Sequence, residues 1–264
     1  MKPRLIINGS AGRMGRRIVA IASETGKFDI VAAVDCAEHP DMGTDAGILA
    51  GIGEIGTELT STFPEAGDVV IDFSLPQAAD KTIEYCAKNK VALVIGTTGL
   101  TESHLEKIRA IAENVPVIQG TNMGVGMNAL FKLAGQTAKM LGEEYDIEIV
   151  EAHHRFKKDA PSGSALTLAE NIAAATDREY PDCLVHGREG GDSLREAGTI
   201  GMHSIRAGDI TGEHSVIFST LGETITLSHS AHSRDTFVRG AVRAALWLVG
   251  KEPGLYSMAD VLGL

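Results

Sequence analysis

The sequence predicts an α/β protein with a doubly wound parallel sheet domain and a smaller α+β domain that has a mixed or antiparallel sheet. In the first half of the chain, short runs that are apolar throughout alternate with helical patterns, as in a parallel sheet covered on both faces. A glycine-rich turn follows the first of these runs. After Asn122, three strand-like runs occur with no helix between them. Together these observations indicate a Rossmann-like nucleotide-binding architecture joined to a second, different sheet.

The elements of the first half follow one another in a regular order. Strands are predicted over residues 5–8, 30–34, 68–73, 91–95 and 115–119. Helices are predicted over residues 16–23, 77–88 and 102–112. The segment 43–56 holds five glycines and is expected to form an irregular surface loop.

The second half is organised differently. Helices are predicted over residues 128–141 and 164–175, and strands over 146–151, 199–206, 214–220 and 223–229. The polar, glycine-rich stretch 176–198 is expected to be a mobile loop, and the apolar helix 237–249 is expected to pack back on the first domain. The predicted domain boundaries are therefore 1–124 with 234–264, and 125–233.

Composition excludes several classes of function. With 44% hydrophobic and 22% charged residues, the chain is typical of a soluble globular protein, and its net charge of −11 disfavours nucleic acid or an anionic membrane as a partner. It has no run of 18 apolar residues and no leader pattern at Met1, so we expect neither a membrane span nor secretion. Cys36, Cys86 and Cys183 form no C-x-x-C pair, which favours a reducing, cytoplasmic setting without a disulfide framework or a bound metal.

The turn after the first strand reads Gly-Ser-Ala-Gly-Arg-Met-Gly over residues 9–15. Glycines at such a turn let the backbone approach a pyrophosphate, which the N-terminus of the following helix stabilises. A structural connector is the alternative, but the position between an N-terminal strand and a helix favours dinucleotide binding. The candidate cofactor-binding residues here are Gly9, Ser10, Ala11, Gly12, Arg13 and Met14.

Asp35 ends the second predicted strand, where an acidic residue accepts hydrogen bonds from an adenosine ribose; a strand-end cap fits this position equally well. Residues 36–41 contain no Arg or Lys to neutralise a 2′-phosphate, and their acidic side chains would repel one. We therefore expect NADH to be preferred. Use of NADPH stays open, because Arg13 or Arg16 is near enough in sequence to reach such a phosphate.

Two further polar turns follow predicted strands at their carboxyl ends, the sheet edge where ligands of open α/β proteins bind. The turn after residues 91–95 offers hydroxyls to a nicotinamide ribose or a substrate, although it also suits a cap for the next helix. The turn after residues 115–119 lies at the domain switch, where a nicotinamide carboxamide needs partners. The candidate residues are Gly96, Thr97, Thr98, Gly120, Thr121, Asn122 and Met123.

Residues 148–165 contain the densest set of chemically active side chains. Two adjacent histidines and three cations follow a hydrophobic strand: His153, His154, Arg155, Lys157 and Lys158. The Pro-Ser-Gly-Ser run at 161–164 is typical of a helix start, whose backbone N–H groups hold an anion. Such a segment is suited to bind a small carboxylate and to donate a proton, because the unperturbed pKa of histidine lies near neutrality. A solvated basic loop is the alternative interpretation.

This stretch resembles the signature of the bacterial 4-hydroxy-tetrahydrodipicolinate reductases (dihydrodipicolinate reductases) of lysine biosynthesis. Their pattern, E-[IV]-x-E-x-H-x-x-x-K-x-D-x-P-S-G-T-A, matches residues 148–165 with a single departure, Ser164 in place of Thr. The resemblance extends to residues 9–15, 94–99, 198–201, 206–209, 212–214 and 240–247. Other departures are Cys36, where many members carry a basic residue, and Thr121, where others have Ala. The first puts NADPH use in doubt.

The resemblance implies hydride transfer from NAD(P)H to 4-hydroxy-tetrahydrodipicolinate or dihydrodipicolinate, a small dicarboxylate, giving tetrahydrodipicolinate. It implies a dinucleotide-binding first domain, and a second domain that binds substrate and assembles a homotetramer through its sheets. The implied site residues are His153 and Lys157 as proton donors, His154 as a substrate contact, and Gly163 and Ser164 as the holders of a substrate carboxylate.

Two other functions stay open at this point. One is a different dehydrogenase of similar architecture that acts on aspartate or homoserine, which the signature around His153 argues against. The other is a nucleotide-sensing module without turnover, which predicts a defective proton-donor site, whereas His153 and Lys157 are both present. The role of Glu151 is open as well, since it either orients a ring or pairs with Lys157. Asp159 is expected to be a structural cap.

Overall fold

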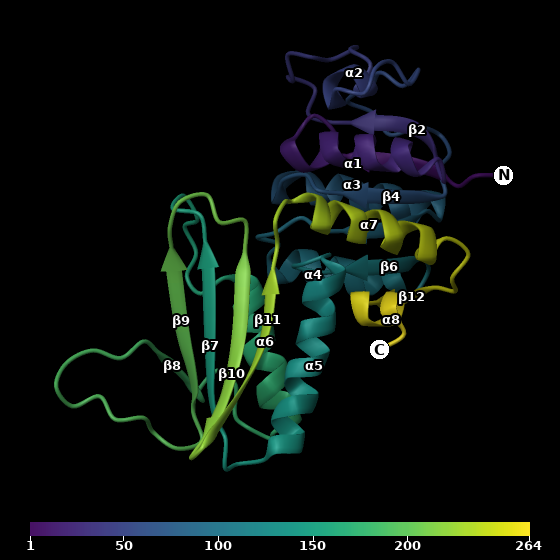
Figure 1. Ribbon diagram of the computed structural model, residues 1–264. Helices are drawn as coiled ribbons and strands as arrows, with labels where there is room; N and C mark the ends of the chain where they lie inside the picture. The colour runs from purple at the N-terminus through teal and green to yellow at the C-terminus, as the bar shows by residue number, and fades with distance from the viewer. The chain divides into compact units, whose positions relative to one another are not determined.

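The computed structural model describes residues 1–264 and divides the chain into two compact units. Unit 1 comprises Met1–Gly124 and Asp235–Gly263, and unit 2 comprises Val125–Arg234 together with Leu264. Each unit has its own sheet (Figure 1). Each also has its own apolar core. None of the helices is both long and apolar enough to span a membrane.

Unit 1 is built on a seven-stranded sheet in the order β12-β6-β5-β4-β1-β2-β3, and all its neighbouring strands are parallel. The strands are β1 (Arg4–Asn8), β2 (Asp29–Val34), β3 (Leu59–Thr60), β4 (Val69–Asp72), β5 (Ala92–Ile95), β6 (Pro116–Gln119) and β12 (Gly254–Tyr256). The strand order reverses between β1 and β4. In open α/β sheets ligands bind outside the carboxyl ends of the strands at such a switch point. The prediction of a doubly wound parallel sheet is confirmed.

Helices cover both faces of this sheet (Figure 1). α1 (Arg13–Thr25) packs beside α7 (Asp235–Leu248), and α3 (Pro76–Asn89) packs beside α4 (Glu102–Ala112). The short helix α8 (Met258–Leu262) contacts α7. Strands between two helical layers bury the side chains of both faces, as at Val69, Val70 and Ile71 of β4, none of which is exposed. This explains why these runs are apolar at successive positions rather than at alternate ones.

Unit 2 contains a five-stranded mixed sheet in the order β11-β10-β7-β9-β8. Its strands are β7 (Asp146–His153), β8 (Leu184–His186), β9 (Ile200–Arg206), β10 (Glu213–Thr220) and β11 (Glu223–Ser230). β7, β9 and β8 are parallel, whereas β10 is antiparallel to β7 and β11. The helices α5 (Val125–Leu141) and α6 (Gly163–Ala175) pack against each other and enclose a core with one face of the sheet. The predicted mixed sheet is confirmed.

Two segments differ from the expectation of irregular loops. Residues 43–56 include the short helix α2 (Ala46–Ala50), and the carboxylate of Asp45 organises them. It accepts hydrogen bonds from the N–H groups of Gly47, Ile48, Ile55, Gly56 and Thr57. Residues 176–198 include β8, which adds to the edge of the sheet. Neither α2 nor β8 is long enough to show a clear periodicity in the sequence.

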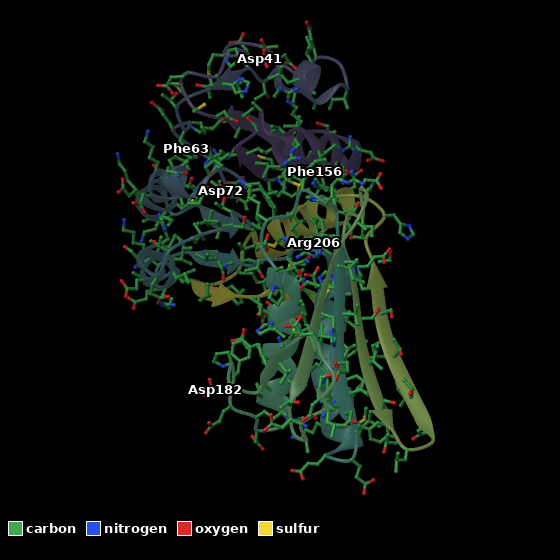
Figure 2. The ribbon with its side chains drawn as sticks, turned by 90° about the vertical axis from the view of Figure 1, so that its left-hand side faces the viewer. Asp41, Phe63, Asp72, Phe156, Asp182 and Arg206 are labelled. Atoms are coloured by element: carbon green, nitrogen blue, oxygen red, sulfur yellow. The ribbon has the colours of Figure 1, made fainter.

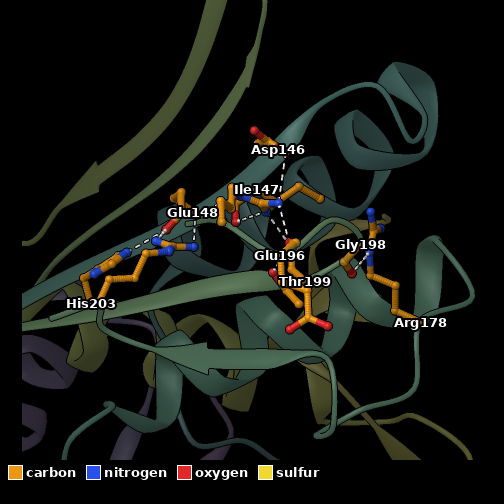
Figure 3. A network of polar contacts seen from close by, with 10 residues as sticks. Asp146, Ile147, Glu148, Arg178, Glu196, Gly198, Thr199 and His203 are labelled. Carbon is orange, nitrogen blue, oxygen red and sulfur yellow. Dashed lines mark hydrogen bonds and ion pairs between the residues drawn. The ribbon is translucent and has the colours of Figure 1, made fainter. Parts of the chain in front are cut away.

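Arginines anchor the second of these segments to the sheet. Arg188 donates two hydrogen bonds to the carboxylate of Glu148 on β7, and Arg195 donates one to the same carboxylate (Figure 3). Nε2 of His203 on β9 lies 2.6 Å from the same carboxylate. Glu148 occupies the space above Gly201, where an added Cβ would lie 1.9 Å from a carboxylate oxygen. The long connection between α6 and β9 is therefore held to β7 chiefly by Glu148, and Arg195 also pairs with Asp146 at 2.9 Å.

Candidate functional site

The glycine turn of unit 1 joins β1 to α1 at the switch point of the sheet. Gly9 has a φ of +77°, and a Cβ there would lie 2.7 Å from the carbonyl oxygen of Phe73. A Cβ at Gly15 would lie 2.1 Å from the carbonyl oxygen of Gly9. Both positions therefore require glycine. Gly12 is the N-cap of α1 and supplies no capping side chain, so the first N–H groups of α1 are available to an anion.

The carboxylate of Asp35 ties this turn to the end of β2. It accepts hydrogen bonds from the backbone N–H of Ala11, at 2.9 Å, and of Cys36, at 2.8 Å. Asp35 thus caps the strand end, which was one of its two predicted roles. Nearby, Arg16 donates to the carbonyl oxygen of Ala11 at 2.8 Å and lies 3.4 Å from the carboxylate of Asp41. Arg13 is exposed on the first turn of α1.

A buried carboxylate that the sequence analysis missed lies under the same edge of the sheet. Asp72, at the end of β4, has no exposed surface, and it is labelled in Figure 2. It accepts hydrogen bonds from the side chain of Asn8 at 3.1 Å, from the hydroxyl of Thr97 at 2.8 Å, and from the N–H and hydroxyl of Ser74. Asp72 therefore holds together the loops that follow β1, β4 and β5. An acidic residue closing an apolar run was the only sequence signal for it.

The other two predicted turns follow β5 and β6. A Cβ at Gly96 would lie 2.3 Å from the ring of Phe73, so this ring packs directly on the backbone and would have to move to admit a side chain. Thr97 is buried, whereas Thr98 and Thr121 are exposed. Oδ1 of Asn122 accepts a hydrogen bond from the N–H of Gly124 at 2.8 Å.

The residues of unit 1 fit a dinucleotide. The glycine turn is compact and ends in an uncapped helix start, which suits a pyrophosphate. The polar turns after β5 and β6 lie at the same edge of the sheet as the glycine turn, because parallel strands all end at that edge. Every predicted cofactor-binding residue belongs to unit 1.

The centre of the candidate site in unit 2 is the carboxylate of Glu151, which has no exposed surface. β7 runs through His153, two residues further than predicted, so Glu151 and His153 point to the same face of the sheet. Oε2 of Glu151 lies 2.5 Å from Nδ1 of His153. The guanidinium of Arg206, which is labelled in Figure 2, donates to both oxygens of Glu151 at 2.9 and 2.7 Å. The register of the sheet explains why Arg206 reaches Glu151, since His153 on β7 pairs with Arg206 on β9.

Electrostatics keep Glu151 ionised. Burial alone would raise the pKa of this carboxyl, but hydrogen bonds from Arg206 and His153 outweigh it and lower the pKa to about 2. For His153 the largest effect is burial, which lowers its pKa. Glu151 opposes that shift by stabilising the imidazolium, while Lys157 and Arg206 reinforce it. The pKa of His153 remains below its usual value.

Ser162 connects this cluster to the start of α6. It is the N-cap of the helix, and its hydroxyl accepts a hydrogen bond from the N–H of Ala165 at 3.2 Å. Its own N–H donates to Glu151 at 3.2 Å, and its hydroxyl lies 3.1 Å from Nε2 of His214. Burial lowers the pKa of His214 to about 3, so this ring is neutral near pH 7. The first turn of α6, with Gly163 and Ser164, is thereby fixed beside the buried cluster.

The turn between β7 and α6 holds the remaining predicted residues. Nζ of Lys157 lies 2.9 Å from Oδ2 of Asp159, so Lys157 pairs with Asp159 and not with Glu151. Asp159 is thus an ion-pair partner. His154 has a buried Nδ1 without a hydrogen-bond partner, and its ring centroid lies 6.3 Å from that of Phe156, an exposed aromatic residue labelled in Figure 2.

The structure brings together the predicted catalytic and substrate-binding residues within unit 2, since His153, His154, Lys157, Gly163 and Ser164 all belong to the β7–α6 connection or its ends. Sequence reasoning missed Arg206 and His214 as neighbours of His153. Both come from strands that are distant in sequence. The arrangement provides an imidazole, an ammonium group and a helix N-terminus in one segment, which suits binding of an anion and transfer of a proton.

The sequence matches two family models. One, described as dihydrodipicolinate reductase, N-terminus, matches residues 3–123, and the other, described as dihydrodipicolinate reductase, C-terminus, matches residues 126–262. The chain is 45% identical over 264 residues to the 4-hydroxy-tetrahydrodipicolinate reductase of Syntrophotalea carbinolica, with 99% of each chain covered. It is 47% identical over 267 residues to that of Alkalilimnicola ehrlichii, with 100% of each chain covered.

Solved structures agree with the fold. A dipicolinate-bound dihydrodipicolinate reductase from Paenisporosarcina sp. TG-14 has a TM-score of 0.75 at 24% identity, covering 98% of this chain and 99% of that one. GenD2 from gentamicin A biosynthesis, in complex with NAD, has a TM-score of 0.61 at 11% identity, covering 99% and 90%. At these identities the likeness establishes the architecture.

Proposed function

The chain belongs to the dihydrodipicolinate reductase family, and we infer that it is an oxidoreductase of lysine biosynthesis. Its reaction is the reduction of 4-hydroxy-tetrahydrodipicolinate, or dihydrodipicolinate, to tetrahydrodipicolinate. The observation that supports this most is the full-length match combined with the Glu151–His153–Arg206 cluster at the head of α6. A nicotinamide cofactor supplies the hydride when bound. The protein's own residues bind the substrate, orient it and supply the proton.

We propose that unit 1 binds the dinucleotide. The residues proposed to contact it are Gly9, Ser10, Ala11, Gly12, Arg13, Met14, Asp35, Gly96, Thr97, Thr98, Gly120, Thr121, Asn122 and Met123. The close backbone approaches at Gly9 and Gly15 and the uncapped start of α1 support this assignment.

The proposed cofactor preference is for NADH over NADPH. Cys36 is exposed and uncharged directly after Asp35, and Glu38 is exposed beside it. Arg16, a candidate partner for a 2′-phosphate, already lies 3.4 Å from Asp41. An added phosphate would have to compete with that carboxylate for the guanidinium, which weakens NADPH binding without abolishing it.

Unit 2 is the proposed substrate-binding part, and its ligand is a small dicarboxylate. We propose that the first turn of α6, at Gly163 and Ser164, holds one carboxylate through the helix N-terminus. His154 and Lys157 contact the substrate from the preceding turn. The pairing of Lys157 with Asp159 supports this, because it holds the ammonium group over the turn when no substrate is present.

His153 and Lys157 are the proposed proton donors. Hydride addition to a conjugated cyclic imine leaves one delocalised anion, with its electron density shared between a ring carbon and the ring nitrogen, and a single proton delivered to it completes the reduction. Because burial lowers the pKa of His153 below its usual value, its imidazolium gives up a proton more readily at that moment. The ammonium group of Lys157 also offsets developing negative charge.

We also propose that copies of the chain assemble as a homotetramer through the open sheet face of unit 2. On the face opposite α5 and α6, β9 presents Ile205, which is 48% exposed, and β7 and β10 present Val150 and Ile217. Sedimentation velocity on the purified protein tests this, and a monomer would reject it. Three free cysteines support the proposed cytoplasmic location.

A steady-state assay tests the proposed function. The purified chain is mixed with 4-hydroxy-tetrahydrodipicolinate, generated in place by its preceding synthase, and oxidation of NADH or NADPH is followed by absorbance. Turnover with both cofactors, faster with NADH, is expected. Turnover of aspartate or homoserine with NAD⁺, and none of the dicarboxylate, would support another dehydrogenase instead. Nucleotide binding with no turnover of any of them would support a sensing module.

A further inference from the structure

His153 is held at one ring nitrogen by a carboxylate that is itself held by three donors. Glu151 accepts both hydrogen bonds of the Arg206 guanidinium and a third from the N–H of Ser162. Arg206 is fixed in turn by donating to the carbonyl oxygen of Asp159 at 2.6 Å. Glu151 therefore has no freedom to rotate away from the ring.

This arrangement decides the tautomer of His153. A carboxylate that is ionised can only accept hydrogen bonds, so the nitrogen 2.5 Å from Glu151, Nδ1, must carry hydrogen. The other nitrogen, Nε2, faces Gly212, where an added Cβ would lie 3.2 Å away. The absence of a side chain at position 212 leaves space at Nε2.

We propose that Glu151 and Arg206 are positioning residues that fix His153 as its Nδ1–H tautomer, so that Nε2 is the atom that exchanges a proton with the substrate. The proposal rests on the function assigned to His153 above. When the hydride has been added, the Nε2–H bond of the imidazolium breaks and its proton forms a new bond to the substrate anion. The ring becomes neutral and keeps its Nδ1–H bond to Glu151. A proton from water restores the imidazolium for the next turnover.

The charged groups around the ring act in opposite directions. They come from every element packed against it: Glu151 on the same strand, Lys157 with Asp159 in the next turn, Arg206 on β9, and the neutral His214 on β10, whose ring centroid is 5.2 Å away. Glu151 favours the imidazolium, whereas Lys157 and Arg206 disfavour it. Removing the charge of Glu151 and removing that of Arg206 should therefore have opposite effects on the protonation of His153.

The test is the pH dependence of kcat/KM for two variants. The rate should fall on the alkaline side as His153 loses its proton. In Glu151→Gln this limb should move to lower pH by about one unit, with kcat reduced about 10²-fold because the ring is no longer fixed. In Arg206→Gln the limb should move to higher pH, by less than in Glu151→Gln, because Arg206 has a weaker effect on the ring than Glu151. Displacement of the alkaline limb in opposite directions distinguishes a positioning role from general loss of structure. Loss of structure would lower kcat/KM in both variants without moving their alkaline limbs apart.

Glu148→Gln is the matched control. Glu148 lies on the same strand, accepts hydrogen bonds from two arginines, and lies 2.6 Å from a histidine nitrogen, and its pKa is also about 2 (Figure 3). It faces the opposite side of the sheet from His153. Its substitution should leave the alkaline limb where it is in the wild type.

The outcomes separate this inference from the function on which it rests. If His153→Gln keeps the alkaline limb, the proton-donor role of His153 fails. If His153→Gln removes the limb, but Glu151→Gln and Arg206→Gln move it in the same direction or not at all, the positioning role is overturned and the proton-donor role stands.

A second measurement needs no variant. Nitrogen-15 NMR of histidine-labelled wild-type protein at pH 8 should show His153 with hydrogen on Nδ1 and a lone pair on Nε2. The reverse tautomer would overturn the proposal even if the variants do not fold.

Discussion

Four hydrogen-bonding groups converge on Glu151: Nδ1 of His153, two guanidinium nitrogens of Arg206 and the N–H of Ser162. A carboxylate without exposed surface is costly unless it is paired and fully hydrogen-bonded. Here the pairing supplies that compensation and also fixes the imidazole. The same contacts therefore stabilise the charge of Glu151 and orient the His153 ring for proton transfer.

His153→Gln should bind NADH as the wild type does and lose turnover by about 10²-fold or more, because glutamine offers no titrating group. Fluorescence titration measures the first quantity and the steady-state assay the second. His186→Gln, at an exposed position on β8, is the control and should keep its turnover. Unchanged turnover in His153→Gln would remove this residue from the mechanism.

Cys36→Arg should raise kcat/KM with NADPH relative to NADH about tenfold, since a guanidinium next to Asp35 can pair with a 2′-phosphate. The ratio of the two steady-state constants is the readout. Cys36→Gln has a similar reach without charge and should leave the ratio as it is. An unaltered ratio in Cys36→Arg would show that selectivity lies elsewhere.

Among the helices and strands, close backbone contacts fix which faces meet. α7 packs beside α1 and against β4, β5 and β6, and its residue Gly240 lies against the chain just after β6. A Cβ at Gly240 would be 1.6 Å from the carbonyl oxygen of Met123. Gly240 thus allows α7, which comes from the C-terminal part of the chain, to pack closely against the backbone at Met123 within unit 1.

Gly240→Ala should destabilise unit 1 by about 3 kcal/mol, although alanine normally favours a helix over glycine. The clash involves a backbone carbonyl, so only a shift of α7 relieves it. Urea unfolding measures the loss. Gly191→Ala, where an added Cβ meets no atom within 4 Å, should change stability by less than about 0.5 kcal/mol. Equal effects of the two substitutions would contradict this account of α7.

The molecule as a whole carries a net charge of −11, and the carboxyl and imidazole groups whose pKa values are most strongly lowered all lie in unit 2. Glu148 and Glu151 have pKa values lowered to about 2, and His214 has one lowered to about 3. In each case the unfolded chain binds a proton more readily than the folded one. Stability must therefore decrease as the pH falls.

The free energy of unfolding should decrease in two stages on acidification. Between pH 6.5 and about 4.5, unfolded His214 takes up a proton that the buried ring does not, costing up to about 1.4 kcal/mol per pH unit. Below about pH 4.5 the two glutamates add their contribution, which is lost as the pH approaches 2. Urea unfolding at a series of pH values measures this. A level stability from pH 6.5 to 4.5 would show that His214 is not neutral in the folded protein.

The amino-acid sequence by itself determined the order of the elements, the doubly wound sheet, the glycine turn and the family signature. These features depend on local patterns: apolar runs, helical periodicity and residues at short fixed spacings. α4 begins and ends where its pattern predicted, and Gly9 and Gly12 occupy the predicted turn.

Only the tertiary structure decided which side chains meet. Glu151 and Arg206 are 55 residues apart, and Asp72 lies 64 residues from Asn8 and 25 from Thr97. Such pairs are created by the register of β7 on β9 and of β4 on its two neighbours, which no local pattern encodes. Strand register follows from the burial of whole sheet faces, a property of the folded chain, so the partners of His153 became visible only once the sheet was assembled.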